Sequence, residues 1–239
     1  MMHSIYHEKK KIDFKVKRKN VKNINLRVNH NLEITVSANN YVPIDYIKEF
    51  VYSKARWIEN NLNYYKNIVG TNQGKKKYVS GESLRYLGRQ YRLKVFKSSE
   101  DDVKYFRGYI HLYTRDLEDT EKKENLINRW YKERSKIIFK ESLERMYALV
   151  RFYDIEFPKL NIRKMKSRWG TCYYKNNKII INSVLIKAPK DCIDYVILHE
   201  LIHFKHNKHD NDFYKLLSIL MPNWRDKKRI LNEVVVREL

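Results

Sequence analysis

The motif HELIH at residues 199–203 constrains this chain more than any other stretch of its sequence. Two histidines four positions apart lie on one face of an α-helix, one turn apart, where both imidazoles can bind a single metal ion. The flanking sequence predicts such a helix, because Pro189 precedes acidic residues near the expected N-terminus and apolar residues recur at helical spacing. We therefore expect a His-Glu-x-x-His motif on a buried helix, the context that this motif requires.

The glutamate of the motif, Glu200, follows the first histidine directly. On a helix its side chain is rotated by about 100° from that of His199, so it can face the metal site without binding the metal. A carboxylate in that place can take a proton from an attacking water molecule. Glu200 is therefore the predicted general base.

A catalytic zinc usually has three protein ligands and one open position. The motif supplies His199 and His203, and the polar stretch that follows contains His206 and His209. We expect His209 to be the third ligand, because the chain has to turn before the next helical pattern. His206 is the alternative, although one more helical turn would carry it away. The two cysteines of the chain lack metal-type spacing, so we expect a catalytic Zn²⁺ bound by histidines.

Composition and charge limit the remaining possibilities. The chain has 239 residues, 43% hydrophobic residues and a formal net charge of +22. It has no apolar run long enough for a membrane helix and no signal-peptide pattern at its start, so we expect a cytoplasmic protein without a membrane partner. The charge fits either a solvated basic surface or non-specific contact with nucleic acid. No clear aromatic–basic platform is visible in the sequence.

The pattern of apolar residues predicts an α+β protein with two parts. Residues 1–118 show mainly the alternation of β-strands with one helix near 43–68, and we expect a β-rich domain that could cap a substrate site. Residues 119–239 begin with a long helix and contain strands near 159–165 and 178–183 around the metal helix. We expect the second of these strands to offer its edge to an extended peptide. No internal repeat is evident.

Several segments resemble one known family, the YgjP-like metal-dependent hydrolases, which are relatives of the SprT-like zinc metalloproteases. The resemblance rests on "SRWGTC" at 167–172, "GESLRYLGRQYRLKV" at 81–95, "MPNW" at 221–224 and the histidine motif itself. It implies a small zincin-like (minigluzincin-type) catalytic domain. Position by position, it also implies the zinc ligands His199, His203 and His209 and the acid/base Glu200.

Two further residues are candidates for substrate binding. Arg168 could hold a carboxylate, a phosphate or an oxyanion, or it could form an ion pair with Asp194. Asn182 is a weaker candidate, and Trp169 is expected in the core.

Three functions remain open from the sequence. The first is a zinc metallopeptidase acting on a peptide or protein. The second is a metal-dependent nucleoside triphosphate pyrophosphatase acting on UTP, an activity that the resemblance also includes and that the basic charge would suit. The third is a basic module associated with nucleic acid, or a protease recruited to DNA-linked proteins.

Overall fold

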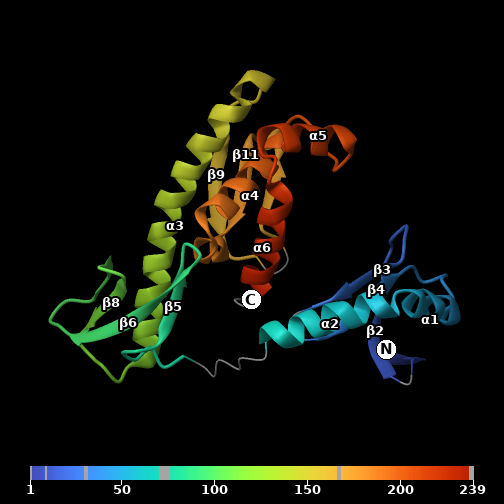
Figure 1. Ribbon diagram of the computed structural model, residues 1–239, viewed down its shortest axis with the longest axis horizontal. Coiled ribbons are helices and arrows are strands. Elements are labelled where there is room, and N and C mark those ends of the chain that lie inside the picture. Colours follow the sequence, from blue (N-terminus) through green and yellow to red (C-terminus); the bar gives the residue numbers. More distant parts are fainter. Residues whose placement is uncertain (1, 9, 30–31, 70–75, 166–167, 237–239) are drawn as a thin grey trace. The chain divides into compact units, whose positions relative to one another are not determined.

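The computed structural model describes residues 2–8, 10–29, 32–69, 76–165 and 168–236 (Figure 1). Two compact units divide the chain, residues 1–73 and residues 74–239. Helices and sheets are both present in each unit, so the protein belongs to the α+β class that the sequence predicts. No helix within the described part of the chain combines the length and apolar character needed to cross a membrane.

The first unit consists of one four-stranded sheet and two helices. Its strands, in spatial order, are β1 (Met2–His7), β2 (Lys10–Arg18), β4 (Ile34–Ala38) and β3 (Asn25–Val28). The helices α1 (Ile44–Ser53) and α2 (Ala55–Val69) are separated at Lys54, where the sequence predicted a single helix. Apolar residues at every second position of β2 are buried against α1 and α2, whereas Lys11, Lys15 and Lys17 face outward.

The second unit begins with another four-stranded sheet. Its strands, in spatial order, are β5 (Ser83–Tyr86), β6 (Arg89–Lys97), β8 (Tyr109–Thr114) and β7 (Asp102–Phe106). Both hairpins close with two residues of positive φ, at Leu87–Gly88 and Arg107–Gly108. This conformation matches the twist of the strands and explains why glycine occupies the second place of each turn.

The two four-stranded sheets have the same topology, a repeat that the sequence does not reveal. In each, the outer pairs of strands are antiparallel and the two central strands are parallel. Each central parallel pair ends with an equivalent hydrogen bond, from Lys19 N to Ala38 O at 2.9 Å and from Ser98 N to Thr114 O at 3.0 Å. Helices follow each sheet along the chain.

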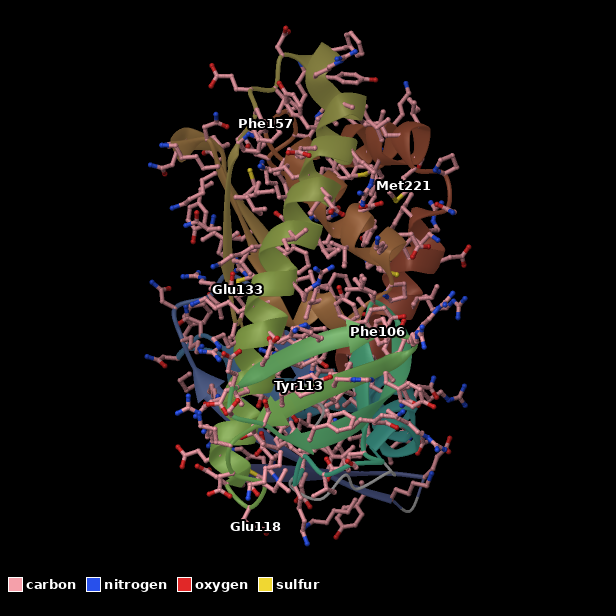
Figure 2. The ribbon with its side chains drawn as sticks, turned by 90° about the vertical axis from the view of Figure 1, so that its left-hand side faces the viewer. Phe106, Tyr113, Glu118, Glu133, Phe157 and Met221 are labelled. Atoms are coloured by element: carbon pink, nitrogen blue, oxygen red, sulfur yellow. The ribbon has the colours of Figure 1, made fainter. Side chains whose placement is uncertain are left out.

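The long helix α3 (Thr120–Val150) is the spine of the second unit. Asp119 caps it by accepting a hydrogen bond from Lys122 N at 2.9 Å. The sheet β5–β8 packs on its N-terminal half, and β9 and α4 pack beside it farther along (Figures 1 and 2). The described part of the chain also contains short 3₁₀ segments at Arg151–Tyr153, Tyr174–Asn176 and Ser183–Lys187. The remaining elements are β9 (Lys159–Arg163), β10 (Gly170–Tyr173), β11 (Lys178–Asn182), α4 (Lys190–Ile202), α5 (Asn211–Leu220) and α6 (Trp224–Val236).

The position of the division between the units differs from the sequence-based boundary at 118/119. Leu93, Ile110 and Leu112 of the β5–β8 sheet share one core with Ile127 and Phe139 of α3. The sheet β5–β8 therefore belongs with the second unit. The sequence could not indicate which unit the sheet belongs to, because a change from a strand pattern to a helix pattern occurs within domains as well as between them.

The three-stranded sheet has the order β10-β11-β9, with β10 antiparallel and β9 parallel to β11. The strand that the sequence predicted to offer its edge, β11, is therefore the central one. The strands at the two edges are β9 and β10, and β10, which was not predicted from the sequence, packs against α4.

Candidate metal centre

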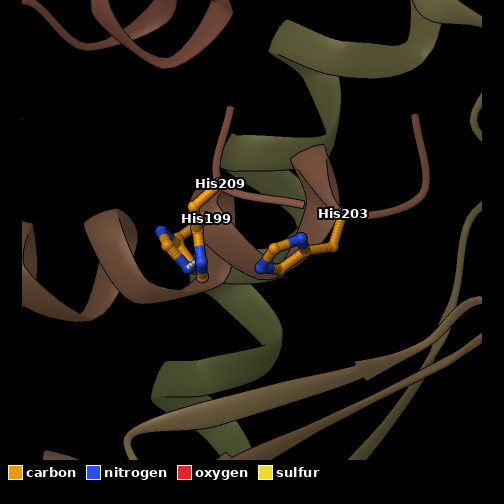
Figure 3. Close-up of side chains that lie close together, drawn as sticks. All are labelled: His199, His203 and His209. Atoms are coloured by element: carbon orange, nitrogen blue, oxygen red, sulfur yellow. Dashed lines mark hydrogen bonds between the residues drawn. The ribbon is translucent and has the colours of Figure 1, made fainter. Parts of the chain in front are cut away.

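Three histidine side chains converge at the C-terminal end of α4 (Figure 3). His199 lies in the last turn of α4, and His203 follows its last residue with right-handed helical backbone angles. His209 arrives from the next segment, just before α5. Asp210 fixes this return by capping α5, since its side chain accepts a hydrogen bond from Phe213 N at 3.0 Å. The Asp210 N-cap thus stabilises the turn that brings His209 back toward α4.

The distances between the rings suit a single metal ion. The ligand atoms of the three histidines all lie within 4.8 Å of one another, and the Nε2 atoms of His199 and His209 are 2.8 Å apart. The ring centroids are separated by 5.0, 4.8 and 4.7 Å, so the triangle is nearly equilateral. Two nitrogens bound to one tetrahedral zinc are about 3.3 Å apart, a spacing within this range.

The orientation of His203 is set by a backbone group. Its Nδ1 lies 2.9 Å from the carbonyl oxygen of His206, which accepts a hydrogen bond from the ring. Nδ1 then carries the proton, and the lone pair of Nε2 remains free for a metal, as is usual for a metal-binding histidine. His206 therefore contributes to the site through its main chain. Phe213, which is fully buried, packs within 4.9 Å of all three imidazole rings.

The surroundings keep the three imidazoles neutral, the form that binds metal. Burial is the main cause that lowers the pKa of His199 to about 3, and the neighbouring His203 and His209 lower it further. Burial also lowers the pKa of His203 and that of His209. The Nδ1 atom of His199 is buried without a hydrogen-bond partner among the described residues. Three neutral imidazoles with converging nitrogens form a donor set that fits zinc.

Glu200 lies beside the histidines, and only 6% of its surface is exposed. Burial raises the pKa of its carboxyl group to about 8, against the opposing effects of the Arg168 charge and of a hydrogen bond donated by Cys172 N. A carboxyl group whose pKa lies near neutrality can both accept and donate a proton. Perturbation of this size inside a cavity is typical of a functional group.

Gly170 explains how the strand β10 can approach Glu200 so closely. A Cβ atom on Gly170 would lie 2.7 Å from both Cγ and Oε1 of Glu200. No side chain fits there without displacing the carboxylate. The glycine of the "SRWGTC" segment is thus required by contact with the candidate base, and its backbone angles lie outside the left-handed region.

The histidines and Glu200 open into a cavity of about 670 Å³. Arg168 lies on its rim and is exposed, and Lys228 of α6 lines it as well. Lys228 also lowers the pKa of His199 and His209 through its charge. Glu200 is the only carboxylate among the lining residues, so the described wall of the cavity favours negatively charged groups. Among the described residues of the second unit, none before Arg168 lines the cavity.

Of the two predicted substrate-binding residues, the structure places only Arg168 at the cavity. Asn182 is 2% exposed, and its side chain is hydrogen-bonded to the main chain of Met165 and Arg168. Its amide nitrogen donates to the carbonyl oxygens of Met165 and Arg168, both at 2.8 Å. These contacts give Asn182 a structural role in holding the loop.

The ion pair suggested between Arg168 and Asp194 is absent, because Asp194 pairs with Arg145 at 2.8 Å and accepts a hydrogen bond from Ser142. Trp169 is half-buried, packs against the core and lines the cavity. Sequence reasoning missed Lys228, which lies 28 residues after Glu200 in a helix without a recognisable motif. The residues around Lys228 in the sequence contain no pattern that predicts its contact with the metal cavity.

Comparison with known proteins agrees with the residues quoted above. The model of the YgjP-like family, described as a metallopeptidase domain, matches residues 22–234. No curated protein matches the chain.

Two solved structures are similar over part of the chain. The metallopeptidase zymogen abylysin of Pyrococcus abyssi is 20% identical, with a TM-score of 0.36, over 41% of this chain and 93% of its own. The metallopeptidase zymogen jannalysin of Methanocaldococcus jannaschii is 17% identical, with a TM-score of 0.35, over 42% of this chain and 90% of its own. Because the family model covers most of the sequence, this chain belongs to the YgjP-like metallopeptidase-domain family.

Proposed function

We propose that the protein is a zinc-dependent peptidase of the zincin type, with His199, His203 and His209 as the metal ligands and Glu200 as the general base. The observation that carries the proposal is the convergence of three neutral imidazoles beside a buried carboxyl group in one cavity. Nitrogen donors of this kind favour zinc over magnesium or calcium, which prefer oxygen ligands.

Bound zinc would supply Lewis-acid activation of a carbonyl group and of a water molecule. Glu200 would take a proton from the attacking water and return it to the leaving amine. Its raised pKa suits both steps, since the group can change protonation state near neutral pH. The hydrogen bond from Cys172 N holds the carboxylate in position for this transfer.

A peptide is the substrate that the site suits best. Strand β10 is at the edge of its sheet, packs against α4, and contributes Gly170, Thr171 and Cys172 to the cavity wall. An extended peptide could add to this edge through backbone hydrogen bonds, which require little sequence preference. The scissile bond would then lie close to Glu200, because Gly170 and Glu200 are in contact.

The positive charges of Arg168 and Lys228 in the cavity wall are the observation that admits a second candidate, hydrolysis of a nucleoside triphosphate such as UTP. Their charges would equally bind a peptide carboxylate, so they do not separate the two substrates. The family model describes a peptidase, and this supports the first candidate.

Elemental analysis of purified variants tests the metal site. We expect about one zinc per chain in the wild-type protein and in Glu200→Gln, and a strong loss of zinc in His209→Ala. The matched control is His206→Ala, which should keep its zinc because only the main-chain carbonyl of His206 contacts His203. Retention of zinc by His209→Ala, or its loss from His206→Ala, would show that the ligand set is wrong.

Substrate screening of the zinc-loaded protein then separates the activities. Cleavage of peptides by wild type but not by Glu200→Gln supports the peptidase. Release of pyrophosphate from UTP without peptide cleavage would replace it with the second candidate.

A further inference from the structure

The sheet β5–β8 has one face that packs on α3 and one face that is covered by aromatic and basic side chains. The packed face carries the apolar residues of β6, β7 and β8, such as Leu93, Val103 and Ile110. Alternation along each strand places the intervening residues on the opposite face. The residues of that outer face are Arg92, Lys94 and Phe96 of β6, Tyr109, His111 and Tyr113 of β8, and Asp102, Lys104 and Phe106 of β7.

The five rings of this outer face form a connected band. His111 is at its centre, with centroids 5.4 Å from Phe96, 6.1 Å from Phe106, 6.3 Å from Tyr109 and 6.3 Å from Tyr113. Phe96 and Tyr113 are stacked at 5.3 Å with an interplanar angle of 21°. Phe96 and Phe106 are 39% and 53% exposed, although rings of this size are usually buried. Tyr113 and Phe106 are labelled on the sheet in Figure 2.

Positive charges are interleaved with the rings. The ammonium of Lys94 lies 3.8 Å from the centroid of Tyr109, and that of Lys104 lies 6.0 Å from the centroid of Tyr113. The guanidinium of Arg107, in the hairpin turn, lies 5.0 Å from the centroid of Phe106. The single carboxylate on the face, Asp102, is paired with Lys104 at 2.9 Å.

The first unit provides an internal comparison, since its sheet has the same topology. The central pairs Lys15–Thr35 and Lys17–Ser37 correspond to Lys94–His111 and Phe96–Tyr113, counted back from the last pair of each parallel ladder. The first sheet therefore has one aligned lysine, Lys15, but Thr35, Ser37 and Lys17 where the second sheet has His111, Tyr113 and Phe96. The fold does not require aromatic residues at these positions, so the rings need another explanation.

We propose that the outer face of β6, β7 and β8 binds single-stranded nucleic acid. Bases would stack on the exposed rings, and the backbone phosphates would pair with Lys94, Arg92 and Arg107. Sheet faces that combine aromatic rings with positive charges bind single strands in this way, without strong sequence preference. A duplex buries the faces of its bases, so it would gain only the charge interaction. Protein interfaces are depleted in lysine, whereas Lys94 and Lys104 lie within this band of rings.

A hollow of about 630 Å³ adjoins the band, lined by Phe106, His111, Tyr113, Trp130 and Arg134 among other residues. This hollow is deeper than the flat band of rings. A base at the end of a row of stacked bases could bind in it, next to Arg134. All of these residues lie apart from the wall of the metal cavity, so this inference does not depend on the proposed peptidase activity.

No aromatic–basic platform is visible in the sequence, because its residues come together only in the folded sheet. The rings lie on three strands, and their spacing along the chain is irregular because residues of the buried face and a turn separate them. Only the pairing of β6 with β8 and of β7 with β8 brings them onto one face.

Fluorescence anisotropy of labelled dT12 tests the proposal on the full-length chain. We expect the wild type to bind dT12 at least ten-fold more tightly than a twelve-base-pair duplex at the same salt concentration. The double variant Phe96→Leu/Phe106→Leu, which keeps apolar bulk but removes two rings, should raise Kd by about ten-fold or more, because stacking on each ring is worth about 1–3 kcal/mol.

Two matched controls use the first sheet. Tyr6→Leu removes an exposed ring from its outer face, and Lys15→Ala removes the lysine that corresponds to Lys94. We expect both to bind dT12 as the wild type does, and Lys94→Ala to weaken binding several-fold. No binding of dT12 would overturn the proposal. Equal binding of the duplex, or equal losses for Lys15→Ala and Lys94→Ala, would overturn it in favour of binding by charge alone.

A second measurement covers the case in which the double variant fails to fold. Ultraviolet crosslinking of wild-type protein to dT12, followed by peptide mapping, should label peptides that contain residues 94–97 and 104–113. Crosslinks confined to other parts of the chain would contradict the proposed surface.

Discussion

Gly170→Ala is the substitution that tests most directly how the structure positions the candidate base. The added methyl group would lie 2.7 Å from Cγ and Oε1 of Glu200, whereas ordinary contacts begin at 3.4 Å. The carboxylate therefore has to retreat by about 0.7 Å, or the strand β10 has to move. Backbone strain does not contribute, because the φ angle of Gly170 lies outside the left-handed region.

The expected effect follows from this displacement. A catalytic group misplaced by about 1 Å can lower the rate about 100-fold. We therefore expect kcat on a peptide substrate to fall by about 10- to 100-fold, which corresponds to about 1.4–2.7 kcal/mol of activation free energy. Zinc content should remain at the wild-type level, because the three heavy atoms nearest to the added methyl group all belong to Glu200.

The assay combines steady-state kinetics with elemental analysis for Gly170→Ala, Glu200→Asp and the double variant. Glu200→Asp withdraws the carboxylate by one methylene and makes room for the methyl group. The two substitutions should therefore be coupled, so that Gly170→Ala costs much less activity in the Glu200→Asp background. Full activity of Gly170→Ala, or additive losses in the double variant, would refute the reasoning. Loss of zinc from Gly170→Ala would show that the strand acts on the histidines instead.

Two further predictions concern stability. Burial raises the pKa of the Glu200 carboxyl group to about 8 from its usual 4.5. Between these pH values the folded state therefore holds a proton that the unfolded state has released. Rising pH then lowers the free energy of unfolding by up to about 1.4 kcal/mol per pH unit. Metal-free wild type should therefore lose thermal stability relative to metal-free Glu200→Gln between about pH 4.5 and 8, and parallel melting curves of the two would contradict the assignment. Asn182→Ala should lower the free energy of unfolding by about 2–3 kcal/mol in urea titrations, because it removes the hydrogen bonds that the buried amide donates to the carbonyl oxygens of Met165 and Arg168. A change below 0.5 kcal/mol on the same scale, about the size of an ordinary surface substitution, would show that water replaces these bonds.

Local features of the chain could be predicted from the sequence. The helix that carries His199 and Glu200 and the long helix α3 both depend on residues within a few positions of one another. Periodicity and capping report such short-range structure directly. For the same reason the α+β class was predicted correctly, and the family resemblance placed the chain among the YgjP-like metallopeptidases, where the family model also places it.

Features that depend on distant segments were decided only by the tertiary structure. Four features depend on contacts between residues that lie far apart in the chain. They are the division at residues 73/74, the edge position of β10, the contact of Gly170 with Glu200, and the position of Lys228 in the cavity wall. The buried, structural role of Asn182 belongs to the same group. An amino-acid pattern records which face of a strand is buried, but the partner strand and its register follow from packing of the whole core. The sequence around one helix was therefore enough to predict the candidate metal ligands and base. The wall of the site and the aromatic face of β6–β8 depend on the pairing of strands that are far apart in the chain.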